Sequence, residues 1–266
     1  MQGPEQIAGR ANVLGCRVDL VDMAQSLRVV SEFIMKGQPR QVITLNAEII
    51  YAARRHAELR QVIEGAGLVT PDGAGVVWAA RFLGYPVWER VTGIDLAGAL
   101  AAEAAVQGWR VFLLGARPGV AAQAADNLVA QYPGLRVVGT QHGYFQEEEM
   151  ERLLAEIKDS RPDLLLVGLG APYQEFWIHR YQRELEVPVA VGVGGSLDVL
   201  AGRVRRAPGW LIRLNLEWLY RLVLEPRRWR RQLVLPCFVW QVIRQKLGGT
   251  VEPMAGNGPP AGGEEE

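Results

Sequence analysis

The chain has 266 residues and a formal net charge of zero at pH 7, with 29 basic and 29 acidic side chains. Hydrophobic residues make up 49% of it and charged residues 22%, which supports a buried core and excludes a disordered chain, a collagen-like fibre and a disulfide scaffold. The length fits one large domain, or one domain with an appendage.

The N-terminal segment lacks the basic start and the apolar stretch of a secretory signal, so we expect a cytoplasmic protein. No apolar run approaches the roughly 20 residues of a membrane-spanning helix, so no such helix is expected. Further along, short apolar segments alternate with longer helical patterns, and the predicted strands are QVITLN, WRVFLLGA, LRVVGTQ, PDLLLVGLG and VPVAVGVGG.

Strands that are apolar throughout indicate a sheet that helices cover on both faces. The sequence therefore predicts an α/β fold with a Rossmann-like, doubly wound, mostly parallel sheet, and with ligands at the carboxyl ends of the strands. Residues 72–107 are rich in helix formers and glycine, and we expect them to form a helical subdomain at one edge.

Polar side chains follow the first of these strands and the segment after it. Thr44 and Asn46 are two residues apart at a strand end, so both can face a substrate, or they can cap the helix that starts near Ala47. Asp72 lies on a turn before a helix, where a carboxylate can act as a general base or as a plain N-cap. Asp95 has the same two interpretations.

Several later strands end in glycine, at Gly115 and at Gly194-Gly195 among others. Glycine lets backbone N–H groups approach a ligand, and the N-terminus of a following helix favours an anion such as a diphosphate. We therefore expect a nucleotide along this rim, although the same glycines can simply make tight turns. The dinucleotide fingerprint GxGxxG is incomplete because position 197 is Leu, so a dinucleotide cofactor is not expected.

Two more polar sites follow strand ends. Gln174, with Glu175 beside it, lies in the first turn of a helix and can contact a sugar or a base. Asp198 can accept a hydrogen bond from a ribose, or can cap its own helix. The three histidines are scattered and no DxD pair occurs, so we expect no divalent metal, and arginines would neutralise a phosphate instead.

The segment 203–246 holds 11 basic and two acidic residues, a net charge of +9, together with four of the eight tryptophans. Arginine mixed with Trp and Leu is typical of a helix at an anionic membrane surface. The alternatives are a helix docked on its own core or on another subunit, and a nucleic-acid surface, which the long aliphatic residues disfavour. A spacing of four residues joins Arg213, Glu217, Arg221 and Glu225. This spacing predicts one helix with a polar stripe, and the helix ends or bends at Pro226.

These features suggest three parts: an α/β body at 1–202, a basic and aromatic appendage at 203–248, and a Gly/Pro-rich acidic tail at 249–266 without a role in chemistry. Taken in order, the motifs resemble the WecG/TagA/CpsF glycosyltransferases, which elongate undecaprenyl-diphosphate-linked sugars in bacteria. The resemblance runs from about Val13 to Lys246. It rests on Thr44–Glu48, Thr70–Gly73, Val91–Asp95, Gly168–Glu175, Gly192–Asp198, Arg205–Pro208, Leu216–Arg221 and Glu225–Trp229.

The resemblance implies an inverting, metal-independent enzyme without a cofactor. It would move N-acetylmannosamine from UDP-N-acetylmannosamine to the 4-hydroxyl of undecaprenyl-diphosphate-linked N-acetylglucosamine, for teichoic acid or a related surface polysaccharide. Asp72 then matches the general base, with Thr44 and Asn46 beside it. Residues expected to bind substrate are Gln174, Asp198, Gly194, Gly195, Gly115, Asp95, Arg221, Arg228 and Arg231.

The resemblance also implies that the appendage holds the enzyme on the inner face of the cell membrane. The sequence leaves open whether the donor is instead the uronic acid of UDP-N-acetylmannosamine or UDP-glucose, and whether the chain forms a homo-oligomer. More distant alternatives are a nucleotide-binding oxidoreductase or epimerase, and a regulatory module whose basic helix binds a protein or a nucleic acid. An oxidoreductase would need a complete GxGxxG, which is missing.

Overall fold

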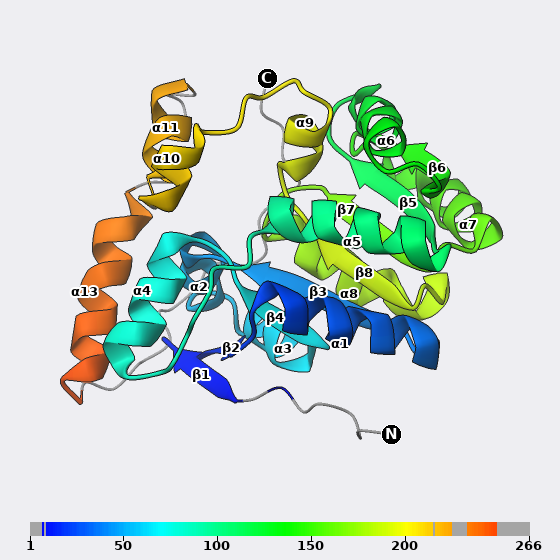
Figure 1. Cartoon of the computed structure of the whole chain (residues 1–266). Coiled ribbons are helices and arrows are strands. Elements are labelled where there is room, and N and C mark those ends of the chain that lie inside the picture. The colour runs from blue at the N-terminus through cyan, green and yellow to red at the C-terminus, as the bar shows by residue number, and fades with distance from the viewer. Residues whose placement is uncertain (1–6, 8, 215, 225–232, 249–266) are drawn as a thin grey trace, which may run out of the picture.

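The computed structural model describes residue 7 and residues 9–214, 216–224 and 233–248. Its centre is a sheet of six parallel strands in the order β4-β3-β8-β7-β5-β6 (Figure 1). The strands are β3 (Arg40–Leu45), β4 (Leu68–Pro71), β5 (Arg110–Gly115), β6 (Arg136–Gln141), β7 (Leu164–Gly168) and β8 (Val189–Gly192). A separate antiparallel hairpin is formed by β1 (Arg10–Val13) and β2 (Cys16–Asp19). The predicted α/β class and parallel sheet are confirmed.

Helices cover both faces of the sheet. Neighbouring residues of each strand point to opposite sides, so apolar strands present side chains that must be buried on both faces. Val111 and Leu113 pack in one core with the helices of the first face, whereas Phe112 and Leu114 pack in another. The first face carries α1 (Met23–Lys36), α5 (Gly93–Gln107), α6 (Val120–Gln131) and α9 (Ser196–Leu200). The second carries the hairpin, α2 (Ala47–Ala53), α3 (Ala57–Gly65), α4 (Ala74–Leu83), α7 (Met150–Ser160) after a short 3-10 turn (Glu147–Glu149), and α8 (Tyr173–Leu185).

The expected helical subdomain at 72–107 is wrong, because its two helices belong to different faces of the sheet. In α5, Leu96 and Leu100 are fully buried in the core of the first face. In α4, Val76 and Ala80 are buried in the core of the second. A helix that is apolar over most of its surface must bury it against another layer, and here the sheet provides that layer.

The C-terminal segment forms separate helices: α10 (Gly209–Arg213), α11 (Glu217–Leu224) and α13 (Val234–Lys246). The prediction of one helix through Arg213 and Glu217 is therefore wrong. The four-residue spacing suits one helix, but Glu217 begins a new one and directs its carboxylate to ion pairs with Arg90 and Arg206. Glu225 and Pro226 lie outside the described residues.

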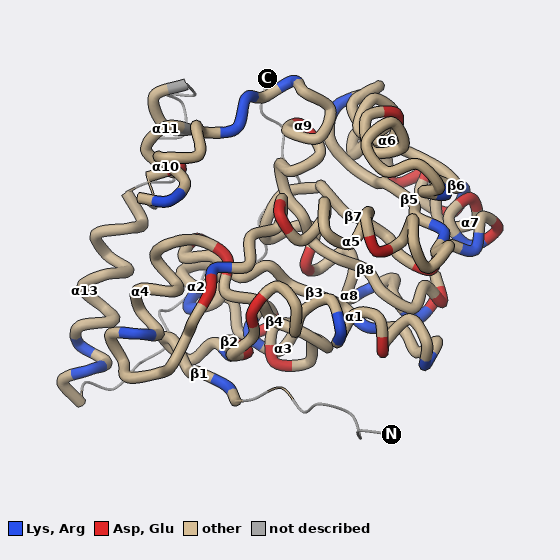
Figure 2. Tube along the Cα trace, viewed as in Figure 1, with Lys and Arg blue, Asp and Glu red and all other residues tan. Residues whose placement is uncertain are grey.

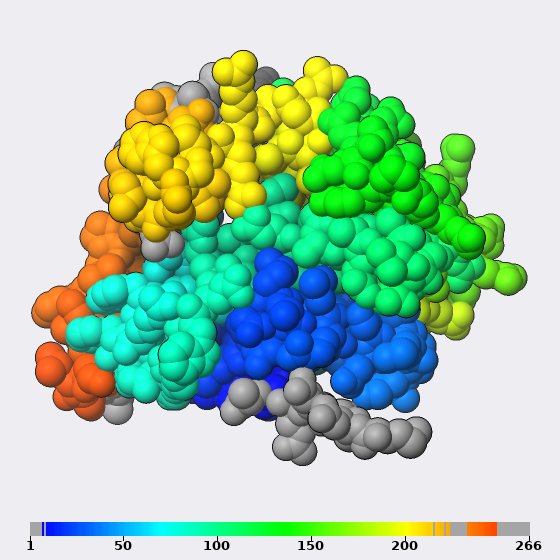
Figure 3. All heavy atoms as spheres, in the orientation of Figure 1, coloured from blue at the N-terminus to red at the C-terminus, as the bar shows by residue number. Residues whose placement is uncertain are grey.

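Helix α13 runs along one edge of the molecule (Figures 1 and 3) and packs against α4 and α2. Phe238 and Val242 are fully buried in the same core as α2 and α4. At the other end of the helix, the Gln245 side chain accepts a hydrogen bond from the Leu14 N–H at 2.9 Å. This agrees with the interpretation of a helix docked on its own core. None of the described helices is long and apolar enough to cross a bilayer.

Candidate active site

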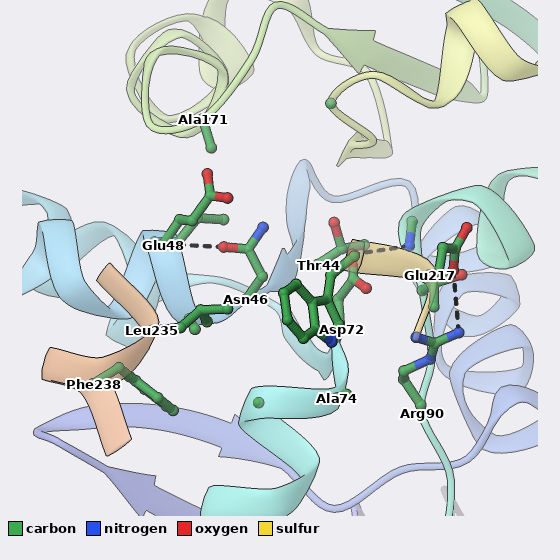
Figure 4. A pocket seen from close by; sticks show the side chains of 18 of the residues that line it. Thr44, Asn46, Glu48, Asp72, Ala74, Arg90, Ala171, Glu217, Leu235 and Phe238 are labelled. Atoms are coloured by element: carbon green, nitrogen blue, oxygen red, sulfur yellow. Dashed lines mark hydrogen bonds and ion pairs between the residues drawn. The ribbon is translucent and has the colours of Figure 1, made fainter. Parts of the chain in front are cut away.

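A cavity of about 1080 Å³ opens at the carboxyl ends of β3, β4 and β8. Its walls come from segments that are far apart in the chain, at 44–49, 72–78, 90–94, 170–174, 193–196, 217–218 and 235–243. Figure 4 shows Thr44, Asn46 and Asp72 near its middle, between the apolar side chains of α13 and the pair of Arg90 and Glu217. Ligands of parallel α/β sheets bind at this end of the strands.

Thr44 and Asn46 both line the cavity, and each also makes an internal contact. The buried Thr44 hydroxyl donates to the Gly192 carbonyl at 2.9 Å and so ties β3 to the end of β8. The Asn46 side-chain oxygen accepts the Ile49 N–H at 3.0 Å and caps α2. The capping interpretation of Asn46 is therefore right, and the cap places this residue at the cavity.

The Asp72 carboxylate lies in the cavity because of a tight turn between β4 and α4. The Asp72 N–H donates to the Leu45 carbonyl at 2.9 Å, and Gly73 follows with a φ of 85°, which favours glycine. Gly73 is the N-cap of α4, so Asp72 does not cap its own helix. Instead, its carboxylate accepts the Gly93 N–H at 3.2 Å, at the N-terminus of α5 (Figure 4). The helix dipole there favours negative charge.

Gln174 connects the first turn of α8 with the glycine loop after β8. Its side-chain oxygen accepts the Gly194 N–H at 3.0 Å, and its amide nitrogen donates to a Glu175 oxygen at 2.8 Å. The cavity is lined by three residues that the sequence predicted to bind substrate: Gln174, Gly194 and Gly195. Glu175 is fully buried behind them, and burial raises the pKa of its carboxyl to about 7.

We expect Glu175→Gln to stabilise the protein at alkaline pH. The unfolded carboxyl ionises near pH 4.5 but the folded one near 7, so the free energy of unfolding of the parent protein falls as the pH rises through this window. Glutamine removes that cost and still accepts from Gln174. Denaturant titration should show a gain of roughly 3 kcal/mol at pH 8 and less than about 1 kcal/mol at pH 5. Equal gains at both pH values would contradict a buried titrating carboxyl.

Three other residues predicted to bind substrate do not line the cavity: Asp95, Asp198 and Gly115. Asp95 forms a two-pronged ion pair with Arg206 at 2.6 and 2.7 Å. Burial opposes its ionisation, but hydrogen bonds from Arg206 and from the Thr92 hydroxyl outweigh this and lower its pKa. Asp198 lies in the first turn of α9.

Gly115 is needed for close contact between strands. A Cβ at this position would lie 2.4 Å from the Gly168 carbonyl oxygen of β7. Its φ of 135° also disfavours a side chain. The glycine therefore lets the end of β5 lie close to the end of β7. This agrees with the interpretation that glycine at this strand end serves a tight turn.

The structure adds three charged residues to the site that the sequence did not predict there: Glu48, Arg90 and Glu217. Arg90 and Glu217 line the cavity and form an ion pair at 3.3 Å, and a second oxygen of Glu217 lies 3.6 Å from Arg206. Arg90 directly precedes the motif 91–95, and Glu217 lies within the motif 216–221. Proximity to these motifs was the only sequence signal for the two residues. They are 127 positions apart, so no local spacing could reveal their ion pair.

The side chains of the three appendage arginines predicted to bind substrate are not among those that the structure describes. Arg221 belongs to α11, but the structure does not describe its side chain, and Arg228 and Arg231 lie outside the described residues. Among the residues that are described, no three His, Cys, Asp or Glu side chains gather in a way that could hold a metal ion.

Comparison with known proteins identifies the family. The model of the glycosyl transferase WecG/TagA/CpsF family matches residues 11–252. A Bacillus spizizenii protein is 38% identical over 77% of this chain and 79% of its own length, and a Bacillus subtilis protein is 36% identical over the same shares. A Staphylococcus aureus protein is 34% identical over 89% of this chain and 93% of its own.

All three relatives carry the name N-acetylglucosaminyldiphosphoundecaprenol N-acetyl-beta-D-mannosaminyltransferase. The family model covers nearly the whole described chain, and it includes every segment that lines the cavity. The chain belongs to the WecG/TagA/CpsF family of glycosyltransferases, and it is a sugar-transferring enzyme.

Proposed function

We propose that the enzyme transfers N-acetylmannosamine from UDP-N-acetylmannosamine to the 4-hydroxyl of N-acetylglucosamine on undecaprenyl diphosphate, with inversion and without a metal ion. The names of the relatives support this donor sugar and this acceptor. The observation that carries the proposal is the Asp72 carboxylate, which shares one large cavity with the Arg90 guanidinium and the glycine loop at Gly194.

The proposed reaction is a single displacement. The acceptor hydroxyl attacks the anomeric carbon while Asp72 takes its proton, and the bond from that carbon to the UDP oxygen breaks on the opposite side. One displacement inverts the configuration at the anomeric carbon. A positioned base of this kind contributes typically 10²- to 10⁴-fold to the rate.

Negative charge grows on UDP as it leaves, and positive groups in the cavity stabilise it. A guanidinium has five N–H donors, and the pair with Glu217 engages one terminal nitrogen of Arg90. In this proposal the remaining donors of Arg90 bind the diphosphate, and no metal ion is needed. In the same proposal Arg221, Arg228 and Arg231 add further charge, as the family resemblance implies, and they follow Glu217, which lines the cavity, in the chain.

The proposed acceptor is confined to a membrane, so the enzyme must reach the lipid surface. Five large apolar side chains of the segment α10–α11 are exposed to solvent: Trp210, Leu214, Trp218, Leu219 and Val223. Basic residues precede them in the connection from α9 (Figure 2). Apolar side chains next to arginines favour an anionic bilayer surface. We propose that this segment holds the enzyme on the inner face of the cell membrane.

A donor panel tests the proposed reaction. The full chain is incubated with a lipid-diphosphate-N-acetylglucosamine acceptor and UDP-N-acetylmannosamine, its uronic acid or UDP-glucose, with and without EDTA. We expect transfer from UDP-N-acetylmannosamine, unchanged by EDTA, and a product with the anomeric configuration opposite to that of the donor. Preference for another donor, retention of configuration, or loss of activity in EDTA would each overturn the corresponding part of the proposal.

A further inference from the structure

One wall of the cavity consists of apolar side chains from a single helix. Six residues of α13 line it: Leu235, Pro236, Phe238, Val239, Trp240 and Ile243. The charged residues of this helix, Arg244 and Lys246, come only at its end (Figure 2). Figure 4 shows Leu235 and Phe238 on one side of Asp72, and Arg90 and Glu217 on the other. The cavity therefore has the Arg90–Glu217 pair at one end and the apolar wall of α13 at the other, where Glu48 is the one labelled charged side chain (Figure 4).

The apolar wall continues to the outside of the molecule. Phe238 is fully buried and forms its base, whereas Trp240 is 63% exposed although it lines the same cavity. Trp78 of α4, the helix against which α13 packs, also lines the cavity and is 38% exposed. Its ring stacks on that of Phe82, with centroids 5.3 Å apart. Large apolar side chains that remain exposed around a cavity mark a binding surface for an apolar partner.

We propose that this wall, between α13 and Trp78 of α4, binds the first part of the isoprenoid chain of the lipid-diphosphate acceptor. The inference rests on the proposed function, which places the acceptor sugar at Asp72. A prenyl diphosphate has a charged head joined directly to a long neutral hydrocarbon chain, and the cavity presents the same sequence of environments, from Arg90 to Trp240. Trp78 and Trp240 then determine the preference for a lipid acceptor.

The test compares two acceptors that differ only in the length of the lipid. Trp240→Ala and Trp78→Ala are assayed in the full chain with N-acetylglucosamine diphosphate carrying either a long or a short prenyl chain. We expect KM for the long-chain acceptor to rise about tenfold, which corresponds to about 1.4 kcal/mol of lost binding, with kcat little changed. KM for the short-chain acceptor should stay within about twofold.

Trp88→Ala is the matched control, since Trp88 is 83% exposed and does not line the cavity. It should leave both KM values unchanged. Equal changes of KM for the two acceptors, or no change in Trp240→Ala and Trp78→Ala, would overturn the proposal. So would an equal loss of binding by these variants to vesicles that lack the acceptor, because the wall would then be a general membrane contact.

Direct binding separates this inference from the proposed reaction. Calorimetric titration with geranylgeranyl diphosphate needs no chemistry, and we expect Trp240→Ala to weaken its affinity about tenfold relative to Trp88→Ala. If the parent protein transferred sugar to neither acceptor, the proposed function would fail, and this titration would still decide whether the wall binds a prenyl chain. Equal affinities in the two variants would show that it does not.

Discussion

Asp72→Asn is expected to lower kcat by about 10²- to 10⁴-fold, while the affinity for UDP changes less than about twofold. Asparagine keeps the shape of the side chain and can still accept the Gly93 N–H, but it cannot take a proton from the acceptor hydroxyl. The loss should fall on kcat because the proton moves only in the transition state. Steady-state assays and a UDP titration of the same preparation measure both quantities.

Glu48 is the informative comparison, since it is another carboxylate that lines the same cavity (Figure 4). If Asp72 is the base, Glu48→Gln should lose far less activity than Asp72→Asn. The reverse order would move the general base to Glu48. Equal, small effects would show that neither carboxylate takes the proton.

Phe238→Ala is expected to cost about 3–5 kcal/mol of folding free energy. The ring is fully buried among residues of α2 and α4, and a Cβ on Gly75 of α4 would lie 3.8 Å from it. Alanine would leave a cavity in that core and loosen α13 from the body. For a chain of this size we expect a fall of Tm on the order of 10 °C, measured by calorimetry.

Leu247→Ala, just after the same helix, is a suitable control because Leu247 is exposed, and its Tm should change by less than about 2 °C. An unchanged Tm in Phe238→Ala would mean that α13 is not part of the core in solution. For the same reason, removal of the chain from Arg203 onward should destabilise the body.

The sequence was informative about the fold where apolar runs were long. The five strands predicted from such runs are all present in the sheet. The strand β4 was missed because it has only four residues and ends in Pro71, so it carries almost no periodic signal. Its pairing of Thr70 with Thr44 nevertheless brings Asp72 to the end of β3. A strand this short becomes recognisable only in the structure, from its pairing with a neighbouring strand.

Within the site, residues at strand ends were the easiest to find. Thr44 lies at the end of β3, and Asn46 and Asp72 directly follow β3 and β4. Gln174 lies in the first turn of the helix after β7, and all four residues line the cavity. Asp95 looks the same in sequence, yet it pairs with Arg206, which is 111 positions away. Local sequence cannot distinguish a carboxylate that faces a cavity from one that meets a distant arginine.

The contribution of α13 was also beyond the sequence. A helix that mixes Trp, Leu and Val with terminal basic residues suits either a membrane surface or a docked position. Only the folded chain shows that one side of this helix completes a core and that another part of its surface lines the cavity.

Hydrogen–deuterium exchange with and without UDP tests most directly the claim that the cavity at the ends of β3, β4 and β8 is the donor site. We expect UDP to slow exchange of the backbone amides at 72–75 and 193–197. The rim at 115–120, beyond β5, should exchange at the same rate with and without UDP. Protection limited to that rim, or protection nowhere, would contradict the account.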